Sequence, residues 1–279
     1  MRNEFQYSIT YSQENLSYNY PVALRGDTSL FQSAKQAGYD AIELHAANPG
    51  NLDIQHIKNR LMQNKLELSA IATGLEYSIN NLSLIDEEKQ VREAAIRRLR
   101  EYVDLAEYFG CPVIVGCMRG NIPDQARGFG ERRYYEYLQE GIGQVCTYAD
   151  SKNTIILFEA INYYVNNYLN SLDDVARWIQ GTGQKNLKLH IDTHHMNIEE
   201  KDLPDAILNA GAMIGYVHFS DSNRMYPGAG NIDFSAIVAA LKKIRYAGYV
   251  TLEVTPFPSP DVAINRGISN IKEIESSLT

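Results

Sequence analysis

Four residues with metal-binding side chains lie at the ends of four successive apolar segments. Glu159 ends "ILFE", Asp192 ends "LHID", His218 lies in "YVHF" and Glu253 ends "VTLE". Three carboxylates held close together repel one another unless a cation neutralises them. Three oxygen donors with one imidazole suit Mn²⁺ best, with Mg²⁺ or Co²⁺ as alternatives. Any one of the four could instead cap a helix or form an ion pair, but their joint placement favours a site for one divalent metal ion.

These segments belong to a regular alternation of short apolar runs and amphipathic stretches, which is typical of parallel strands joined by crossover helices. Eight strands are expected, at Phe5–Thr10, Ala41–Leu44, Leu66–Ala72, Pro112–Gly116, Thr154–Phe158, Leu187–Ile191, Ile214–Phe219 and Tyr249–Glu253. Eight helices are expected with them, at Leu30–Ala37, Asp53–Asn64, Glu87–Phe109, Glu131–Lys152, Ser171–Gln180, Asp205–Ala210, Phe234–Ile244 and about Pro260–Glu275.

This pattern predicts an α/β fold in which residues 1–279 form a single (β/α)₈ TIM barrel. An open doubly wound sheet would need a glycine-rich fingerprint after the first strand, and "TYSQENLSYNYPVALRG" is not one. Side chains alternate across a strand, so an interior Asp192 places Leu189 and Ile191 against the helices. The same rule turns His218 and Glu253 inward. All four candidate ligands are therefore expected to meet at the C-terminal mouth of the barrel.

Composition and charge exclude several classes of protein. Hydrophobic residues make up 44% of the chain and charged residues 22%, which is ordinary for a globular domain. The net charge of −8, with no basic stretch, argues against a nucleic-acid partner. No apolar run is long enough for a membrane span or a signal peptide, so we expect a cytoplasmic protein without a membrane partner. Cys111, Cys117 and Cys146 form no C-x-x-C pair and are expected to be reduced.

Several of these segments also carry a family resemblance. "DTHHMNIEE", "HFSDSNR", "PGAGNIDF" and the separations between the four candidate ligands resemble the sugar phosphate isomerase/epimerase family with the xylose isomerase-like barrel. Within it, the chain is similar to ketose 3-epimerases of the tagatose/psicose type, and "AIATG" and "VIVGCMRG" also resemble a keto-sugar-acid subgroup. The resemblance covers most of the chain.

The resemblance implies that Glu159, Asp192, His218 and Glu253 bind one divalent metal, and that Glu159 and Glu253 are the catalytic proton-transfer pair. Epimerisation next to a ketone requires removal of a weakly acidic C–H proton, and a metal stabilises the resulting enediolate. The resemblance also implies that His195 and Arg224 bind the sugar substrate. Arg224 could instead be a surface cation that pairs with Asp221.

Other polar residues at strand ends are expected to have smaller roles. Glu43 and Arg119 are candidate substrate-binding residues, although Glu43 could be structural and Arg119 could clamp loops together. His190 is expected to be a satisfied interior histidine one layer below the metal, and His194 to pack or to support the site. His45 and His56 are interpreted as ordinary residues of a strand end and a helix.

One stretch departs from the family pattern. Many 3-epimerases follow the fifth-strand glutamate with Glu-x-x-Asn-Arg-Tyr-Glu, whereas this chain has "EAINYYVNN". Asn162 is kept, but Tyr163 replaces the arginine and Val165 replaces the second glutamate. The metal and base residues are untouched, so this change bears on which sugar is bound.

Alternatives within the same chemistry remain open. They are an aldose–ketose isomerase and an inosose-type dehydratase, and a sugar-binding barrel without activity is the non-enzyme alternative. A Schiff-base aldolase would need a lysine at a strand end, and Lys188 lies too early on its strand. The related abasic-site endonucleases use more histidine ligands and a DNA-binding face. A homo-oligomer, as a dimer or tetramer, is compatible with this reading.

Overall fold

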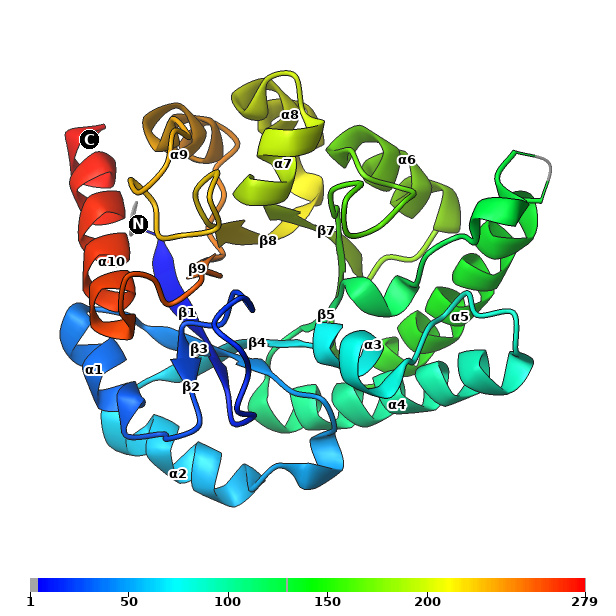
Figure 1. Cartoon of the computed structure of the whole chain (residues 1–279), viewed down its shortest axis with the longest axis horizontal. Helices are drawn as coiled ribbons and strands as arrows, with labels where there is room; N and C mark the ends of the chain where they lie inside the picture. Colours follow the sequence, from blue (N-terminus) through cyan, green and yellow to red (C-terminus); the bar gives the residue numbers. More distant parts are fainter. Residues whose placement is uncertain (1–4, 129, 279) are drawn as a thin grey trace.

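The strands form a closed parallel barrel. The computed structural model describes residues 5–128 and 130–278. The strands of this part are β1 (Gln6–Ser12), β2 (Leu24–Arg25), β3 (Ala41–His45), β4 (Glu67–Ala72), β5 (Val113–Val115), β6 (Ile156–Glu159), β7 (Leu187–Asp192), β8 (Ile214–Phe219) and β9 (Tyr249–Leu252). Strand β1 pairs in parallel with both β3 and β9, which closes the ring. Figure 1 shows the strands at the centre and the helices around them. The predicted (β/α)₈ barrel is confirmed.

The two-residue strand β2 is an addition to the predicted eight. It pairs only with the end of β1, through Tyr11 with Leu24 and Ser12 with Arg25. A strand this short carries no alternation of apolar and polar residues, so the sequence pattern does not reveal it.

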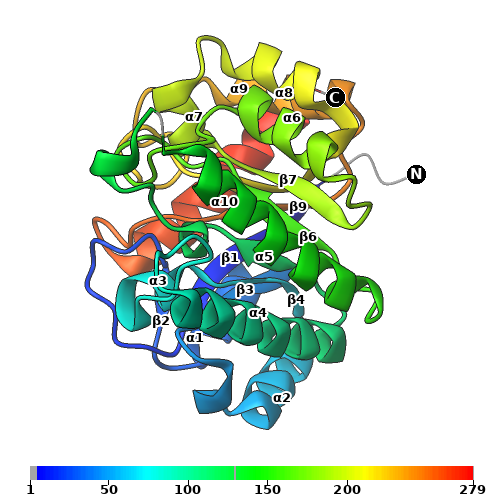
Figure 2. The same cartoon turned by 90° about the vertical axis from the view of Figure 1, so that its right-hand side faces the viewer.

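The helices pack against the outside of the barrel or follow its strand ends. They are α1 (Leu30–Ala37), α2 (Ile54–Asn64), α3 (Gly74–Asn80), α4 (Lys89–Phe109), α5 (Arg132–Asp150), α6 (Leu172–Thr182), α7 (Thr193–Glu199), α8 (Leu203–Ala210), α9 (Phe234–Lys243) and α10 (Pro260–Ser277). Figure 2 shows α4 and α5 side by side along the barrel, where they are in contact. The eight predicted helices are present, and α3 and α7, each directly after a strand, are additional.

Several helices begin at an aspartate that caps the helix N-terminus. The side chains of Asp53, Asp202 and Asp233 each accept a hydrogen bond from the backbone N–H three residues ahead. Such caps satisfy N–H groups that have no partner inside the helix.

The two faces of the strands bury different residues. Leu189 and Ile191 of β7, with Val217 and Phe219 of β8, belong to the large core between strands and helices, as the alternation predicts. The barrel interior holds a smaller apolar cluster that includes Ala72 and Tyr216. Its deeper part is polar: the Tyr216 hydroxyl lies 2.7 Å from Ser69 Oγ and 2.6 Å from Thr251 Oγ1.

Three further expectations concern the cysteines, membrane-spanning helices and the number of domains. Cys111, Cys117 and Cys146 all lie in the described part of the chain and are free thiols. No helix among the described residues has the length and apolar character that crossing a membrane requires. That residues 1–279 form one domain stays a prediction.

Candidate active site

The C-terminal ends of four strands bring together the four candidate metal ligands. Ligand atoms of Glu159 (β6), Asp192 (β7), His218 (β8) and Glu253 (after β9) all lie within 4.8 Å of one another, and all four residues are buried. Glu159, His218 and Glu253 line a cavity of about 490 Å³ at this end of the barrel. Four segments that are remote in sequence therefore converge on one point.

The donor set fits a divalent cation. Two ligand atoms on opposite sides of an ion, each about 2.1 Å from it, are about 4.2 Å apart. The ligand atoms of this site lie within 4.8 Å of one another, so only small side-chain movements are needed to bind an ion. Three carboxylates with one imidazole are the ligands expected for Mn²⁺ or Mg²⁺. These residues could hold a single divalent ion.

His218 is oriented as a metal ligand would be. Its Nε2 lies 2.8 Å from the Glu43 carboxylate, while its buried Nδ1 has no hydrogen-bond partner among the described residues. Nδ1 lies 3.7 Å from Asp192 Oδ2 and 3.4 Å from Glu253 Oε2. Burial disfavours the charged imidazole, but the surrounding carboxylates, Glu43 first, hold the pKa of His218 well above its usual range. The site therefore has an excess of negative charge that attracts a cation.

Asp192 serves two functions at the end of β7. Its Oδ1 accepts the backbone N–H groups of His194 at 2.7 Å and His195 at 3.3 Å, so it caps helix α7. Its Oδ2 accepts a hydrogen bond from Arg224 Nη1 at 2.5 Å. Burial raises the pKa of Asp192, but Arg224 and the nearby histidines outweigh it and hold the pKa well below the usual range. The cap fixes the carboxylate at the centre of the site.

Glu159 occupies space that Gly116 leaves open. A Cβ atom on Gly116 would overlap the Oε2 atom of Glu159. Among the described residues the Glu159 carboxylate accepts no hydrogen bond, and its Oε1 lies 3.6 Å from His195 Nε2. Burial, followed by the nearby carboxylate of Glu253, raises the pKa of Glu159 to about 8. This carboxyl can therefore exchange a proton near neutral pH.

Arg224 reaches into the site from the loop after β8. Its guanidinium pairs with both Asp192 and Glu253 and donates to Ser220 Oγ at 2.8 Å. Its backbone has a φ of 61°, in the left-handed region, and its carbonyl accepts hydrogen bonds from Thr255. The alternative of a surface cation paired with the Asp221 side chain is not what the structure shows.

His195 is locked in one tautomer by Asn162. The Asn162 Oδ1 accepts the Tyr164 N–H at 3.1 Å, so its amide nitrogen, 2.6 Å from His195 Nδ1, is the donor there. The remaining proton of a neutral ring then lies on Nε2, on the side of Glu159. Burial lowers the pKa of His195 to about 3. His195 is thus a neutral hydrogen-bond donor that lines the cavity.

Glu43 lies below the cavity rather than in it. It is fully buried, and its two carboxylate oxygens lie 2.7 Å from His45 Nε2 and 2.8 Å from His218 Nε2. Burial opposes ionisation, but the imidazoles of His218 and His45 hold the pKa of Glu43 well below its usual range. Because both oxygens are already used, we propose that Glu43 positions the two histidines rather than contacting substrate itself.

Arg119 is also fully buried and does not line the cavity. Its guanidinium donates to the backbone carbonyls of Glu159 at 3.0 Å, Tyr168 at 2.9 Å and Leu169 at 3.1 Å. These bonds tie the loop after β6 to the loop after β5. Of the two roles that the sequence allows, we therefore propose the loop clamp.

The remaining histidines of the region differ in their contacts. His190 lies below the site as predicted, with its ring 4.1 Å from that of His218. The expectation that its ring is hydrogen-bonded is wrong, because neither ring nitrogen has a hydrogen-bond partner among the described residues. Burial holds the pKa of His190 well below its usual range, so the ring is neutral. His194 lines the cavity, with Nδ1 3.3 Å from the Asp221 carbonyl.

The segment that departs from the family pattern forms part of the cavity wall. Val165 lines the cavity beside Ile161, and Asn162 holds His195. The Tyr163 side chain is exposed, and its backbone N–H donates to Glu199 at 2.6 Å. This part of the cavity wall is therefore apolar.

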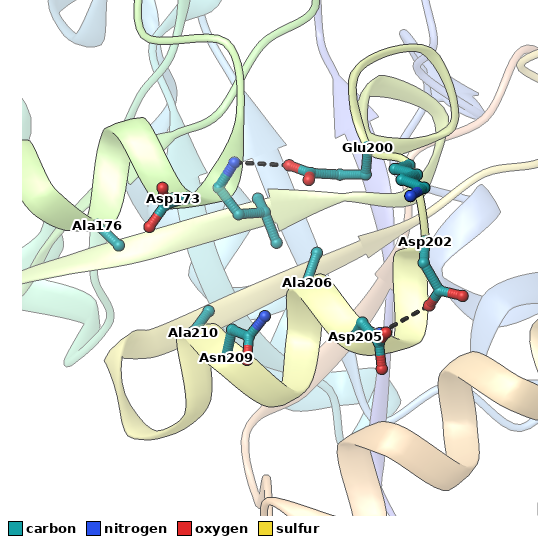
Figure 3. A pocket seen from close by; sticks show the side chains of 10 residues that line it. Asp173, Ala176, Glu200, Asp202, Asp205, Ala206, Asn209 and Ala210 are labelled. Atoms are coloured by element: carbon teal, nitrogen blue, oxygen red, sulfur yellow. Dashed lines mark hydrogen bonds between the residues drawn. The ribbon is translucent and has the colours of Figure 1, made fainter.

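A second cavity, of about 450 Å³, lies outside the barrel between α6 and α8. Figure 3 shows its acidic lining. The Glu200 carboxylate accepts the Leu172 N–H at 2.7 Å, and Asp202 accepts the Asp205 N–H at 2.9 Å. These carboxylates are used to begin helices, so they do not indicate a second centre of chemistry.

Comparison with known proteins identifies the family. The family model described as xylose isomerase-like TIM barrel matches residues 31–274. An L-ribulose 3-epimerase of Methylomonas sp. (strain DH-1) is 30% identical over 253 residues, which cover 89% of this chain and 85% of that protein. A 3-dehydro-D-guloside 4-epimerase of Escherichia coli is 28% identical, over 80% of this chain and 85% of that protein.

Solved structures have the same fold. A D-allulose 3-epimerase of Methylomonas sp. has a TM-score of 0.82 at 24% identity, with 97% of this chain and 98% of that chain covered. The predicted family is confirmed, and so is the predicted isomerase class, since these relatives are named epimerases. The chain belongs to the xylose isomerase-like TIM barrel family.

Proposed function

We propose that the protein is a metal-dependent epimerase that inverts the C3 carbon of a free ketose. The observation that carries this proposal is the convergence of Glu159, Asp192, His218 and Glu253 within 4.8 Å of one another beside a cavity. A divalent cation held by these four residues, most simply Mn²⁺, would polarise the ketone and its neighbouring hydroxyl. It would thereby acidify the C–H bond of the carbon that bears this hydroxyl, next to the ketone.

The two glutamates divide the proton transfer between them. Glu159 and Glu253 come from strand ends β6 and β9, which are separated by β7 and β8 in the barrel. One carboxylate removes the proton from one face of the carbon, and the other carboxyl group returns a proton to the opposite face. Inversion requires two such groups on different sides of the substrate, because a single base would return the proton to the face from which it came.

His195 and Arg224 orient the sugar. The Nε2–H of His195 lies on the side of Glu159, where it can donate to a substrate oxygen next to the reacting carbon. The Arg224 guanidinium lies between Asp192 and Glu253, where it can donate to an oxygen on the other side. Both residues line the cavity.

The charges around the cavity favour a neutral substrate. The described residues that line the cavity include one arginine, Arg224, and no lysine. Arg224 is paired with two carboxylates, and both Nη atoms of Arg119, which lies outside the cavity lining, donate to backbone carbonyls. A phosphate or carboxylate would meet uncompensated negative charge, so we favour a free ketose over a sugar phosphate or a keto-sugar acid.

The test is solvent isotope exchange. Mn²⁺-loaded protein is incubated in D₂O with a panel of free ketoses, phosphorylated ketoses and keto-sugar acids, and NMR locates the deuterium. Deuterium at C3 with inversion there supports the proposal. Deuterium at C1 or C2 of an aldose product indicates an aldose–ketose isomerase instead, and loss of water indicates a dehydratase. Binding without exchange on any substrate would leave a sugar-binding barrel.

A further inference from the structure

His45 lies at the cavity end of β3, on the same interior face as Glu43. It pairs in the sheet with Ala72, which belongs to the interior cluster. Both His45 and Ala72 line the cavity. The position two residues beyond Glu43 therefore places an imidazole at the wall of the substrate space.

The orientation of this imidazole is fixed from below. His45 Nε2 lies 2.7 Å from Glu43 Oε1, and this oxygen is one end of a fully buried carboxylate that also holds His218. An ionised carboxylate only accepts hydrogen bonds, so Nε2 carries the proton. In the neutral ring, Nδ1 is then a hydrogen-bond acceptor.

That acceptor faces the cavity. Among the described residues, Nδ1 of His45 has no hydrogen-bond partner. It does not belong to the unpaired side-chain atoms that are fully buried, so this nitrogen is accessible. Some of the accessible surface of this cavity-lining side chain, which is 7% exposed, therefore belongs to this nitrogen. His45 Nε2 also lies 3.9 Å from Glu253 Oε1, so the ring stands next to one of the two proposed bases.

We propose that His45 is a specificity-determining residue whose Nδ1 accepts a hydrogen bond from a substrate hydroxyl beside the carbon served by Glu253. This inference rests on the proposed function. It adds an acceptor to a site in which His195 and Arg224 supply donors, so that a sugar hydroxyl in the correct configuration is recognised from the β3 side. A sugar without a hydroxyl there leaves the Nδ1 lone pair unpaired.

Two variants separate recognition from support of Glu43. His45→Gln can still donate an amide N–H to Glu43, but its amide oxygen does not occupy the position of the ring Nδ1. His45→Leu loses both the donor and the acceptor. Dissociation constants for Mn²⁺ and for a bound ketose are measured for each variant and for the wild type, together with KM and kcat. The ketose is then replaced by each of its monodeoxy derivatives in turn.

For His45→Gln we expect an increase in the ketose Kd and KM of about fivefold, with the Mn²⁺ Kd unchanged. For one monodeoxy ketose, the wild type and His45→Gln should bind equally, because the hydroxyl that distinguishes them is gone. The assignment would be overturned if His45→Gln bound every monodeoxy ketose more weakly than the wild type by the same factor, or bound none of them more weakly. So would a loss of Mn²⁺ affinity in His45→Gln that matches the change in ketose binding, since that is the result of a structural role alone.

Failure of the proposed function gives a different result. If the wild type binds ketoses without exchanging their C3 proton, the epimerase proposal fails. The binding cycle with monodeoxy ketoses still tests His45 in that case, because it needs no turnover.

Discussion

Glu43 and His218 meet inside the barrel, with the Glu43 Oε2 atom 2.8 Å from His218 Nε2. This contact leaves the Nδ1 atom of His218 facing Asp192 and Glu253. A carboxylate that holds a metal-ligating histidine in this way fixes its tautomer and strengthens it as a ligand. The orientation of this candidate ligand is thus set by a residue outside the proposed ligand set.

Replacement of Glu43 by Gln is therefore expected to weaken Mn²⁺ binding by about 10–100-fold. Isothermal titration calorimetry measures the affinity. Glu76→Gln is the matched control, because Glu76 is also a fully buried carboxylate, but it pairs with Arg98 and Tyr102 away from the site. Equal Mn²⁺ affinities for Glu43→Gln and the wild type would contradict the role given to Glu43.

Gly116→Ala should reduce activity without unfolding the protein. The new Cβ overlaps the end of a flexible side chain, Glu159, which must turn away from its present position. Displacement of a catalytic group by about 1 Å can cost about 10²-fold in rate, so we expect kcat/KM to fall by about 10–100-fold. Gly181→Ala is the control, since a Cβ there meets no atom within 4 Å. Unchanged kcat/KM in Gly116→Ala would show that Glu159 tolerates the shift.

Arg224→Ala should destabilise the metal-free protein more than the metal-loaded one. Loss of the guanidinium removes the cation that is hydrogen-bonded to Asp192 and Glu253, and breaking a buried pair costs about 3–5 kcal/mol. A bound divalent cation supplies part of the missing positive charge. Thermal unfolding with and without Mn²⁺ measures the difference, and Arg177→Ala, which removes an exposed ion pair, is the control. A loss of the same size in both states would argue against a cation at this site.

Mn²⁺ affinity should rise with pH. The pKa of Glu159 in the metal-free fold is about 8, above its ordinary value of 4.5. Protonation of Glu159 therefore stabilises the metal-free fold fully below about 4.5, and this contribution is lost as the pH rises through about 8. Metal binding requires the ionised carboxylate, so at pH 7 the metal displaces this proton. In Glu159→Gln, calorimetry in buffers of different ionisation enthalpy should detect about one proton fewer released. If both proteins released the same number of protons, the group with the raised pKa would not be Glu159.

The sequence predicts the fold and the place of the candidate metal ligands for physical reasons. Alternation along β7 and β8 separates Leu189 and Val217, which face the helices, from Asp192 and His218, which face the interior. The strand ends of such a barrel converge by geometry, so four segments could be assigned to one site before any contact was known.

Other features depend on contacts between remote segments. Arg119 lies as a loop clamp only because three carbonyls, from the last residue of β6 and from the loop after it, surround its guanidinium. Arg224 reaches Asp192 and Glu253 across the mouth of the barrel. No spacing within one segment encodes either contact. Helix α7, by contrast, had a signal in the sequence: Asp192 directly precedes it and caps it.

His45 also had a signal that was available. It follows Glu43 by two residues, so both side chains point to the interior if one does. The expectation that His45 is an ordinary strand-end residue does not use this alternation. The contact of its Nε2 with Glu43 changes that interpretation.

The central claim is that Glu159, Asp192, His218 and Glu253 share one divalent cation, and anomalous scattering from Mn²⁺-soaked crystals tests it most directly. We expect one strong peak within about 2.3 Å of an oxygen of each carboxylate and of His218 Nδ1. A peak that leaves out Glu159 or Glu253, or no peak at this mouth of the barrel at saturating Mn²⁺, would contradict it.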